Sequence, residues 1–265
     1  MPFVTANKLQ LYYEIYGQGP QTLLLLAGLT RDSRCWQWVL PQLSKHFRVV
    51  CLDNRCAGQS DQPDAPFTIA DMAEDVYQVM QALDIAHAHV LGHSMGGFIA
   101  QQLAVTHPEV IDKLILVGTD KGLDSEEAQV YLQERIDFLR SGREISEAEA
   151  ASLKKWLYAQ AFLDDAARVE EIAAWEAENP SPQPVFATLR QAEACMAFHL
   201  GEQVNGISHP ALVIHGEEDR IFPVADGQAL AKNLDAECIV LNDVGHMVPL
   251  EAAQLLNQAV LDFIG

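Results

Sequence analysis

Short apolar runs recur along this chain, and they limit its fold more than any other feature. Each run is rich in Val, Ile and Leu and lacks the polar alternation of a half-exposed strand. Such continuous runs are typical of strands covered on both faces, as in a parallel sheet. Segments with helical spacing separate most of them. The runs occupy residues 22–27, 48–52, 89–91, 114–117, 211–214 and 238–241.

The segments between the runs complete the pattern. Apolar residues recur with helical spacing over 69–83, 98–106, 224–234 and 249–264. Alternation of strand and helix predicts an α/β fold with a mostly parallel, doubly wound sheet. Over residues 3–17, apolar and polar residues instead alternate around Asn7 and Lys8, which predicts an antiparallel hairpin at a sheet edge.

One long region breaks the alternation. Residues 120–209 contain no convincing strand, and helical stretches at 126–140, 146–161 and 166–178 precede a turn-rich segment. We therefore expect a helical cap inserted after the strand at 114–117. The predicted organisation is a first part of the core at 1–119, the cap at 120–209 and a second part of the core at 210–265.

Composition and charge narrow the possible partners. No apolar stretch approaches the roughly 20 residues that cross a bilayer, and the chain does not begin with a basic region followed by an apolar block. The 17 basic and 37 acidic residues give a formal charge of −20, which repels phosphate backbones and anionic lipids. We expect a cytoplasmic protein that binds neither nucleic acid nor membrane; its oligomeric state is left open. The five cysteines lack metal-type spacing, so we expect free thiols and no metal.

A Gly-x-Ser-x-Gly pattern lies at a predicted strand-to-helix junction. The segment Gly92-His93-Ser94-Met95-Gly96 follows the run at 89–91 and precedes a helical stretch. At such a turn the serine takes a strained conformation that lifts its hydroxyl clear of the sheet. Ser94 is therefore the candidate nucleophile.

A serine hydroxyl needs an imidazole to take its proton and a carboxylate to hold that imidazole. In an α/β architecture these groups follow the serine in the order acid, then histidine, each after a strand. Asp219 follows the run at 211–214, and His246 follows the run at 238–241. Among the nine histidines, His246 alone lies past the last strand. Rival acids at this stage are Glu217, Glu218 and Asp120.

Attack on a carbonyl creates an oxyanion, which backbone amides stabilise. The first expected donor is the amide of Met95, directly after the nucleophile. The second is the amide of Leu29, in a turn that follows the run at 22–27 and contains Gly28.

Residues near these groups in the sequence are candidates for contact with substrate. Phe222, Met247 and Val248 flank the predicted acid and base, and Trp36 follows the oxyanion turn. Arg31 lies beside the same turn. It could anchor a substrate carboxylate or merely balance nearby charge.

Taken together, these motifs resemble the α/β-hydrolase fold family over nearly the whole chain. Within that family the sequence is similar to small ester and lactone hydrolases of the 3-oxoadipate enol-lactonase type. Ala27 stands where members often have histidine, and Cys56 stands where they usually have glycine. Cys56 thus implies local strain or a shifted loop; it is either a reactive thiol or a buried one. The matching segments are 92–97, 216–219, 245–246 and the buttressing loop 53–60.

The resemblance implies a serine hydrolase that cleaves small carboxylic esters or lactones through an acyl-Ser94 intermediate, with no cofactor. Its expected partner is a small-molecule substrate. Two other functions stay open at this point. One is a carbon-carbon bond hydrolase of ring-fission products, and the other is a ligand receptor that retains the triad but turns over slowly.

Overall fold

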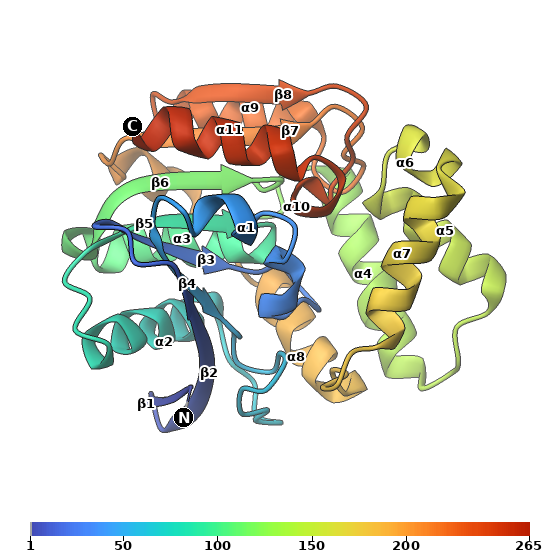
Figure 1. The fold of residues 1–265 in the computed structure, drawn as a ribbon. Coiled ribbons are helices and arrows are strands. Elements are labelled where there is room, and N and C mark those ends of the chain that lie inside the picture. Colours follow the sequence, from blue (N-terminus) through green and yellow to red (C-terminus); the bar gives the residue numbers. More distant parts are fainter. Residues whose placement is uncertain (1) are drawn as a thin grey trace.

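An eight-stranded sheet organises this computed structural model, which describes residues 2–265 (Figure 1). Its strand order is β1-β2-β4-β3-β5-β6-β7-β8. From β4 to β8 in this order each strand is parallel to the next, whereas β1 pairs with β2, and β2 with β4, in antiparallel fashion. The strands are β1 (Phe3–Ala6), β2 (Leu9–Tyr16), β3 (Thr22–Leu26), β4 (Arg48–Leu52), β5 (Ala88–His93), β6 (Ile111–Val117), β7 (Ala211–Gly216) and β8 (Glu237–Leu241).

The predicted strands are confirmed, and their burial explains the apolar runs. Leu25 of β3 pairs with Cys51 of β4 on one side and with Leu91 of β5 on the other, and all three are fully buried. The predicted edge hairpin is also confirmed. Asn7 (φ 49°) and Lys8 (φ 67°) form its turn with the positive φ values that suit the twist of a two-residue hairpin.

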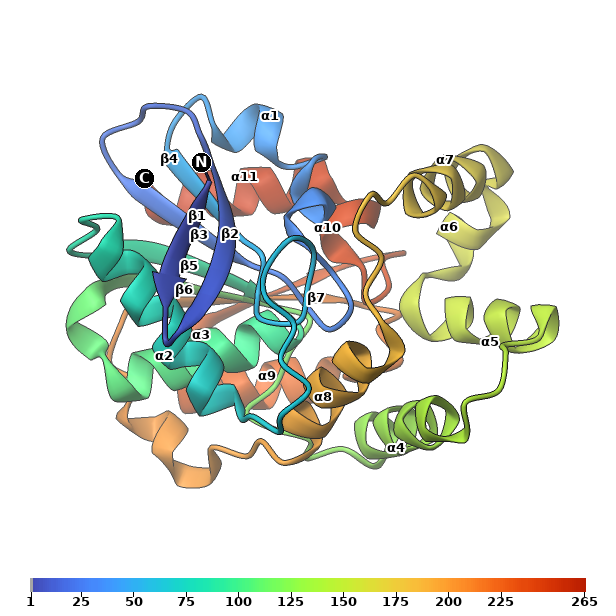
Figure 2. The same ribbon diagram turned by 90° about the horizontal axis from the view of Figure 1, so that it is seen from below.

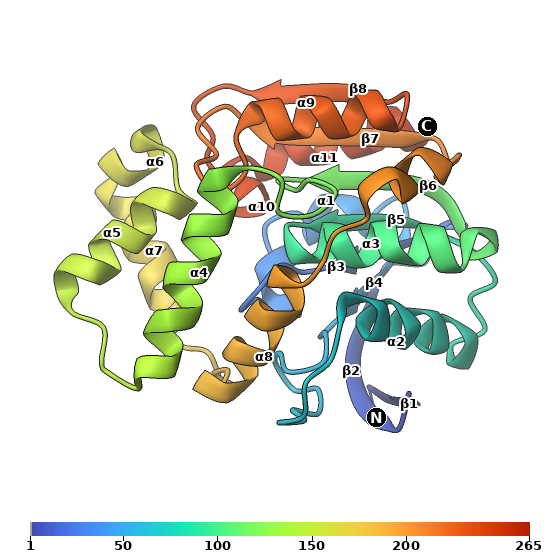
Figure 3. The same cartoon turned by 180° about the vertical axis from the view of Figure 1, so that it is seen from behind.

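Helices cover both faces of the sheet. Figure 3 shows α2 (Ile69–Ala82), α3 (Met95–Thr106) and α9 (Val224–Asn233) on one face. Figure 1 shows α1 (Leu40–Leu43) and α11 (Ala253–Ile264) on the other. The helix expected at 249–264 is interrupted at Ala252 (φ −134°), so that a short helix α10 (Val248–Glu251) precedes α11. Within residues 2–265 we find no helix that combines the length and the apolarity needed to cross a bilayer.

Five α-helices lie between β6 and β7 in the chain, and we call them the cap helices. The arrowheads of β6 and β8 point toward this group in Figure 1, and Figures 1 and 2 show most of it beside the core, with its last helix between the others and the core. The helix expected at 146–161 ends at Leu157 because Tyr158 is extended (φ −123°, ψ 146°). The cap helices are α4 (Glu126–Ser141), α5 (Glu147–Leu157), α6 (Gln160–Asp164), α7 (Ala166–Ala177) and α8 (Val185–Met196).

Candidate active site

Ser94 lies at the junction of β5 and α3 in a strained conformation. Its dihedral angles are φ 54° and ψ −120°, a region that residues with a side chain rarely adopt. Two backbone hydrogen bonds hold it there. The Ser94 N–H donates to the carbonyl of Val117 (2.9 Å), and the Ser94 carbonyl accepts from the Gly97 N–H (2.8 Å). This is the local geometry of a nucleophile elbow.

The two glycines of the motif are required by close backbone approaches. A Cβ atom at Gly92 would lie 2.2 Å from the carbonyl oxygen of Gly96. A Cβ at Gly96 would lie 2.0 Å from the carbonyl oxygen of Leu26 on the neighbouring strand. Neither obstacle is a flexible side chain, so a larger residue at either position would force the elbow apart.

Asp219 and His246 are hydrogen-bonded. His246 Nδ1 donates to Asp219 Oδ2 at 2.8 Å, and both residues are buried. The other carboxylate oxygen accepts from the N–H groups of Ile221 (2.9 Å) and Phe222 (3.0 Å). Burial alone would raise the pKa of Asp219. The contact with His246 and the hydrogen bonds outweigh burial and hold that pKa below its ordinary value. Asp219 is therefore placed to stabilise a protonated imidazole.

His93 is hydrogen-bonded to the backbone of His246. His93 Nε2 donates to the carbonyl oxygen of His246 at 2.8 Å. Burial, reinforced by repulsion from His246, lowers the pKa of His93 to about 3. His93 is consequently neutral near neutral pH and fixes the His246 backbone without adding charge to the site.

Two of the three rival carboxylates, Asp120 and Glu218, have other hydrogen-bond partners, and Glu217 is exposed. Asp120 accepts from the N–H groups of Gly122 (2.8 Å) and Asp124 (3.3 Å), and Glu218 accepts from the Gln160 N–H (3.0 Å). Burial raises the pKa of Asp120 to about 7. Asp120 is thus partly protonated at neutral pH and poorly suited to hold a cationic histidine.

Ser94 and His246 both line a cavity of about 300 Å³ between the core and the cap helices. Asp219 lies behind His246, bonded to Nδ1, which leaves Nε2 as the ring nitrogen available to the cavity. Among the described residues no hydrogen bond joins Ser94 to His246. In enzymes without bound substrate this contact is often long and tightens when substrate binds.

The two predicted oxyanion donors belong to segments that lie next to Ser94. Met95 is the first residue of α3, where a helical N–H has no acceptor within its own helix. Leu29 belongs to a turn closed by a hydrogen bond from the Arg31 N–H to the Gly28 carbonyl (3.2 Å). This turn lies against the elbow, since a Cβ at Gly28 would be 3.1 Å from Ser94 Cβ.

Three of the five predicted substrate contacts line the cavity: Phe222, Met247 and Arg31. The other two, Trp36 and Val248, were wrongly assigned. Both are fully buried in the hydrophobic cluster on the α1 and α11 face of the sheet. Trp36 ends a 3₁₀ helix (Ser33–Trp36) and Val248 begins α10, and these turns direct both side chains into the core.

The cap helices supply polar lining that the sequence analysis did not assign. Tyr131 and Arg135 of α4 and Lys154 of α5 line the cavity, as does Glu176 of α7. Glu176 Oε1 pairs with Arg31 Nη1 at 2.9 Å. Positions 131 and 135 are one helical turn apart, so they share a face of α4. The sequence shows this spacing, but it does not show which side of α4 faces the core.

Cys56 adopts φ 68°, so the strain expected from replacing the usual glycine is present. Its N–H donates to the Asp61 carbonyl (3.0 Å), which helps to hold this conformation. The side chain is fully buried, and burial raises the pKa of the thiol to about 11. The buried cysteine is therefore the better description of the two considered.

Comparison with known proteins agrees with this geometry. The doubly wound sheet, the strained serine at a strand-to-helix turn and the buried Asp-His pair are features expected of an α/β hydrolase. The model of the α/β hydrolase fold family matches residues 21–253, and the chain belongs to that family.

Its relatives include hydrolases with different named substrates. A putative carbamate hydrolase RutD of Yersinia enterocolitica is 29% identical over 96% of this chain and 92% of its own. The 3-oxoadipate enol-lactonase 2 of Acinetobacter baylyi is 28% identical over 97% of this chain and 94% of its own. The crystal structure of the enol-lactonase from Burkholderia xenovorans LB400 superposes with a TM-score of 0.88 at 30% identity, covering 99% of both chains.

Proposed function

We propose that this protein is a serine hydrolase of small carboxylic esters or lactones. The observation that carries the proposal is the strained Ser94 on the same cavity as His246, whose Nδ1 is bonded to the buried Asp219 carboxylate. The enol-lactonase relatives support the same class of bond.

In the proposed reaction Ser94 Oγ attacks the carbonyl carbon while His246 Nε2 takes the hydroxyl proton. Asp219 stabilises the resulting imidazolium. The oxyanion accepts hydrogen bonds from the N–H groups of Leu29 and Met95. Loss of either donor would lower the rate by about 10² to 10³. Collapse expels the alcohol, which takes the proton from His246. A water molecule then attacks the acyl-Ser94 ester with His246 again as base, releasing the acid and restoring the serine.

The cavity lining supports a small substrate with an apolar body. Phe222 and Met247 border the reacting groups, and the cap helices add mainly apolar side chains.

Arg31 is the proposed contact for a substrate carboxylate, in exchange for or alongside Glu176. Arg31→Ala should weaken hydrolysis of carboxylated esters more than of neutral ones. An equal loss on both would remove this role.

Active-site labelling with a fluorophosphonate tests the proposal. The probe should attach to the peptide that contains Ser94, because the activated serine attacks phosphorus as it attacks carbon. Ser94→Ala should abolish labelling, whereas a control, Ser141→Ala at an exposed position on α4, should label like wild type. Labelling elsewhere, or none, would contradict the proposed nucleophile. Turnover of a vinylogous diketo acid in place of p-nitrophenyl esters would favour carbon-carbon bond hydrolysis instead.

A further inference from the structure

The turn that carries the Leu29 amide is hydrogen-bonded to a cap helix. The Thr30 N–H, one residue beyond Leu29, donates to Gln191 Oε1 at 3.3 Å. Gln191 is on α8 and is fully buried. Residues 30 and 191 are far apart in the chain, so the contact exists only while α8 is seated on the core.

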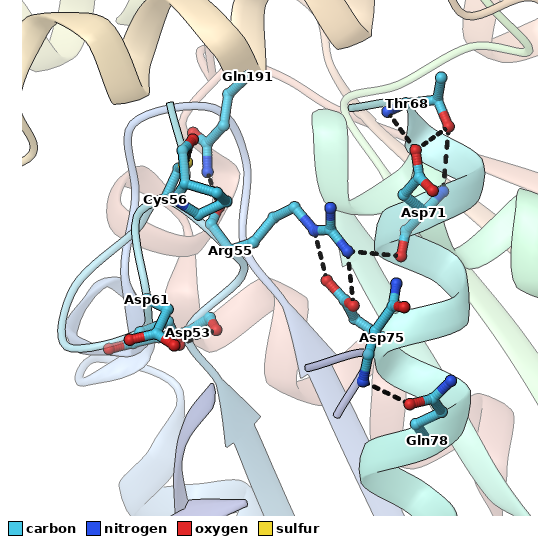
Figure 4. A network of polar contacts seen from close by, with 12 residues as sticks. Asp53, Arg55, Cys56, Asp61, Thr68, Asp71, Asp75, Gln78 and Gln191 are labelled. Carbon is cyan, nitrogen blue, oxygen red and sulfur yellow. Dashed lines mark hydrogen bonds and ion pairs between the residues drawn. The ribbon is translucent and has the colours of Figure 1, made fainter. Parts of the chain in front are cut away.

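The other end of the Gln191 side chain is bonded to the core. Gln191 Nε2 donates to the carbonyl oxygen of Arg55 at 2.8 Å. Figure 4 shows Gln191 beside the 53–61 loop and the Arg55 guanidinium extended toward α2. There Arg55 Nε and Nη2 bond to the two carboxylate oxygens of Asp75 at 2.6 and 2.7 Å, and Nη2 also donates to the Asp71 carbonyl (3.2 Å). A bidentate, buried ion pair thus fixes the residue whose carbonyl holds Gln191.

The turn itself needs such support. Thr30 has φ 67°, a left-handed conformation that is unfavourable for a β-branched residue. From the core, Asn54 Nδ2 donates to the Ala27 carbonyl at 3.0 Å, which holds the start of the segment. Gln191 accepts from the strained residue directly after Leu29. Without that acceptor, the peptide units of the turn could rotate toward a more favourable conformation and carry the Leu29 N–H away.

We propose that Gln191 is a positioning residue for the oxyanion hole: it holds the 28–31 turn so that the Leu29 N–H faces the developing oxyanion. The inference rests on the proposed serine hydrolase function. It also means that seating α8 on the core and completing the oxyanion hole are one event, since the same side chain makes both contacts.

The nearby Gln183 provides a matched control. Gln183 Nε2 donates to the Cys56 carbonyl and to Gln191 Oε1, at 2.6 and 2.9 Å, so it also joins the cap segment to the core. It makes no contact with the 28–31 turn in the described residues. If Gln191 merely attached the cap, replacing either glutamine would have similar effects.

The test compares wild type, Gln191→Met, Gln191→Glu and Gln183→Met on one p-nitrophenyl ester. The inhibition constant of a trifluoromethyl ketone, which forms a tetrahedral adduct bearing an oxyanion, is measured in parallel. Circular dichroism and Tm show that each variant is folded. Gln191→Met should lower kcat by about tenfold or more, a smaller loss than removal of an oxyanion donor would cause. Its KM should stay within about twofold of the wild-type value. Affinity for the ketone should fall by a factor similar to that for kcat.

Gln191→Glu keeps an acceptor for the Thr30 N–H but loses the donor to the Arg55 carbonyl, so its kcat and ketone affinity should lie between those of Gln191→Met and wild type. Gln183→Met should stay within about twofold of wild type in both. The inference is overturned if Gln191→Met keeps wild-type kcat and ketone affinity, or if Gln183→Met loses as much as Gln191→Met. Failure of the proposed function would look different, because wild type itself would then neither hydrolyse the ester nor bind the ketone.

Discussion

His246 Nδ1 lies 2.8 Å from Asp219 Oδ2, and the two residues follow the neighbouring parallel strands β8 and β7. The register of these strands brings their carboxyl ends to one edge of the sheet. There the loops that follow them place the imidazole over the carboxylate. The elbow after β5 brings Ser94 to the same cavity.

Asp219→Asn should lower kcat by about 10⁴, because an amide can neither fix the imidazole tautomer nor stabilise its cation. Steady-state kinetics on an ester measures the loss. Asp120→Asn is the matched control, since Asp120 is also buried after β6, and among the described residues its carboxylate accepts only from backbone N–H groups of its own loop. Its kcat should stay within a few-fold of wild type. A larger loss in Asp120→Asn than in Asp219→Asn would reverse the assignment.

Asp120 also predicts a pH dependence of stability. Its pKa is about 7 in the folded state, raised by burial above the ordinary 3.8. The folded protein therefore binds this proton more tightly than the unfolded chain, and the contribution is present at low pH and lost as pH rises through about 7. Urea unfolding at pH 5 and pH 8 should show wild type losing on the order of 2 kcal/mol more than Asp120→Asn over this interval. Parallel losses in both proteins would show that Asp120 does not titrate in this way.

Gly96→Ala should destabilise the protein by about 3 kcal/mol or more, since the added Cβ would meet the Leu26 carbonyl at 2.0 Å. Gly206→Ala serves as the comparison because a Cβ there has no neighbour within 4 Å among the described residues. Its unfolding free energy should stay within about 0.5 kcal/mol of wild type. Thermal or urea unfolding gives both values. A stable Gly96→Ala protein would mean that the elbow can relax away from β3.

Cys56 should resist alkylation in the folded protein. Burial raises the pKa of its thiol to about 11, so little thiolate is present at pH 8 and the sulfur is shielded from reagent. Iodoacetamide treatment followed by peptide mass spectrometry tests this, with the urea-unfolded protein as the positive control. Rapid modification of Cys56 in the native state would identify it as a reactive thiol after all.

Local sequence patterns predicted most of the core. Continuous apolar runs identified the parallel strands because both faces of that sheet are covered, and Asn7-Lys8 identified the edge hairpin through its turn chemistry. The position of Ser94 at a strand-to-helix turn is confirmed. Its role, and those of Asp219 and His246, stay predictions that the hydrogen bonds support. The division at residues 119 and 209 stays a prediction as well.

The predictions that were wrong, and the residues that the sequence patterns missed, depend on side-chain direction and on contacts between distant segments. Trp36 and Val248 are near the site in sequence, but a 3₁₀ helix and the start of α10 direct them into the core. Tyr131 lines the cavity, and Gln191 contacts the 28–31 turn, only because the cap helices lie at the carboxyl edge of the sheet. No local pattern encodes that placement.

The most direct measurement is to quench the protein with acid during slow turnover of an ester and determine the mass of the peptide containing Ser94. The account predicts that this peptide gains the mass of the acyl group, and that Ser94→Ala shows neither the adduct nor turnover, with a rate loss on the order of 10⁶. Turnover by the Ser94→Ala protein at a rate near that of wild type would contradict it.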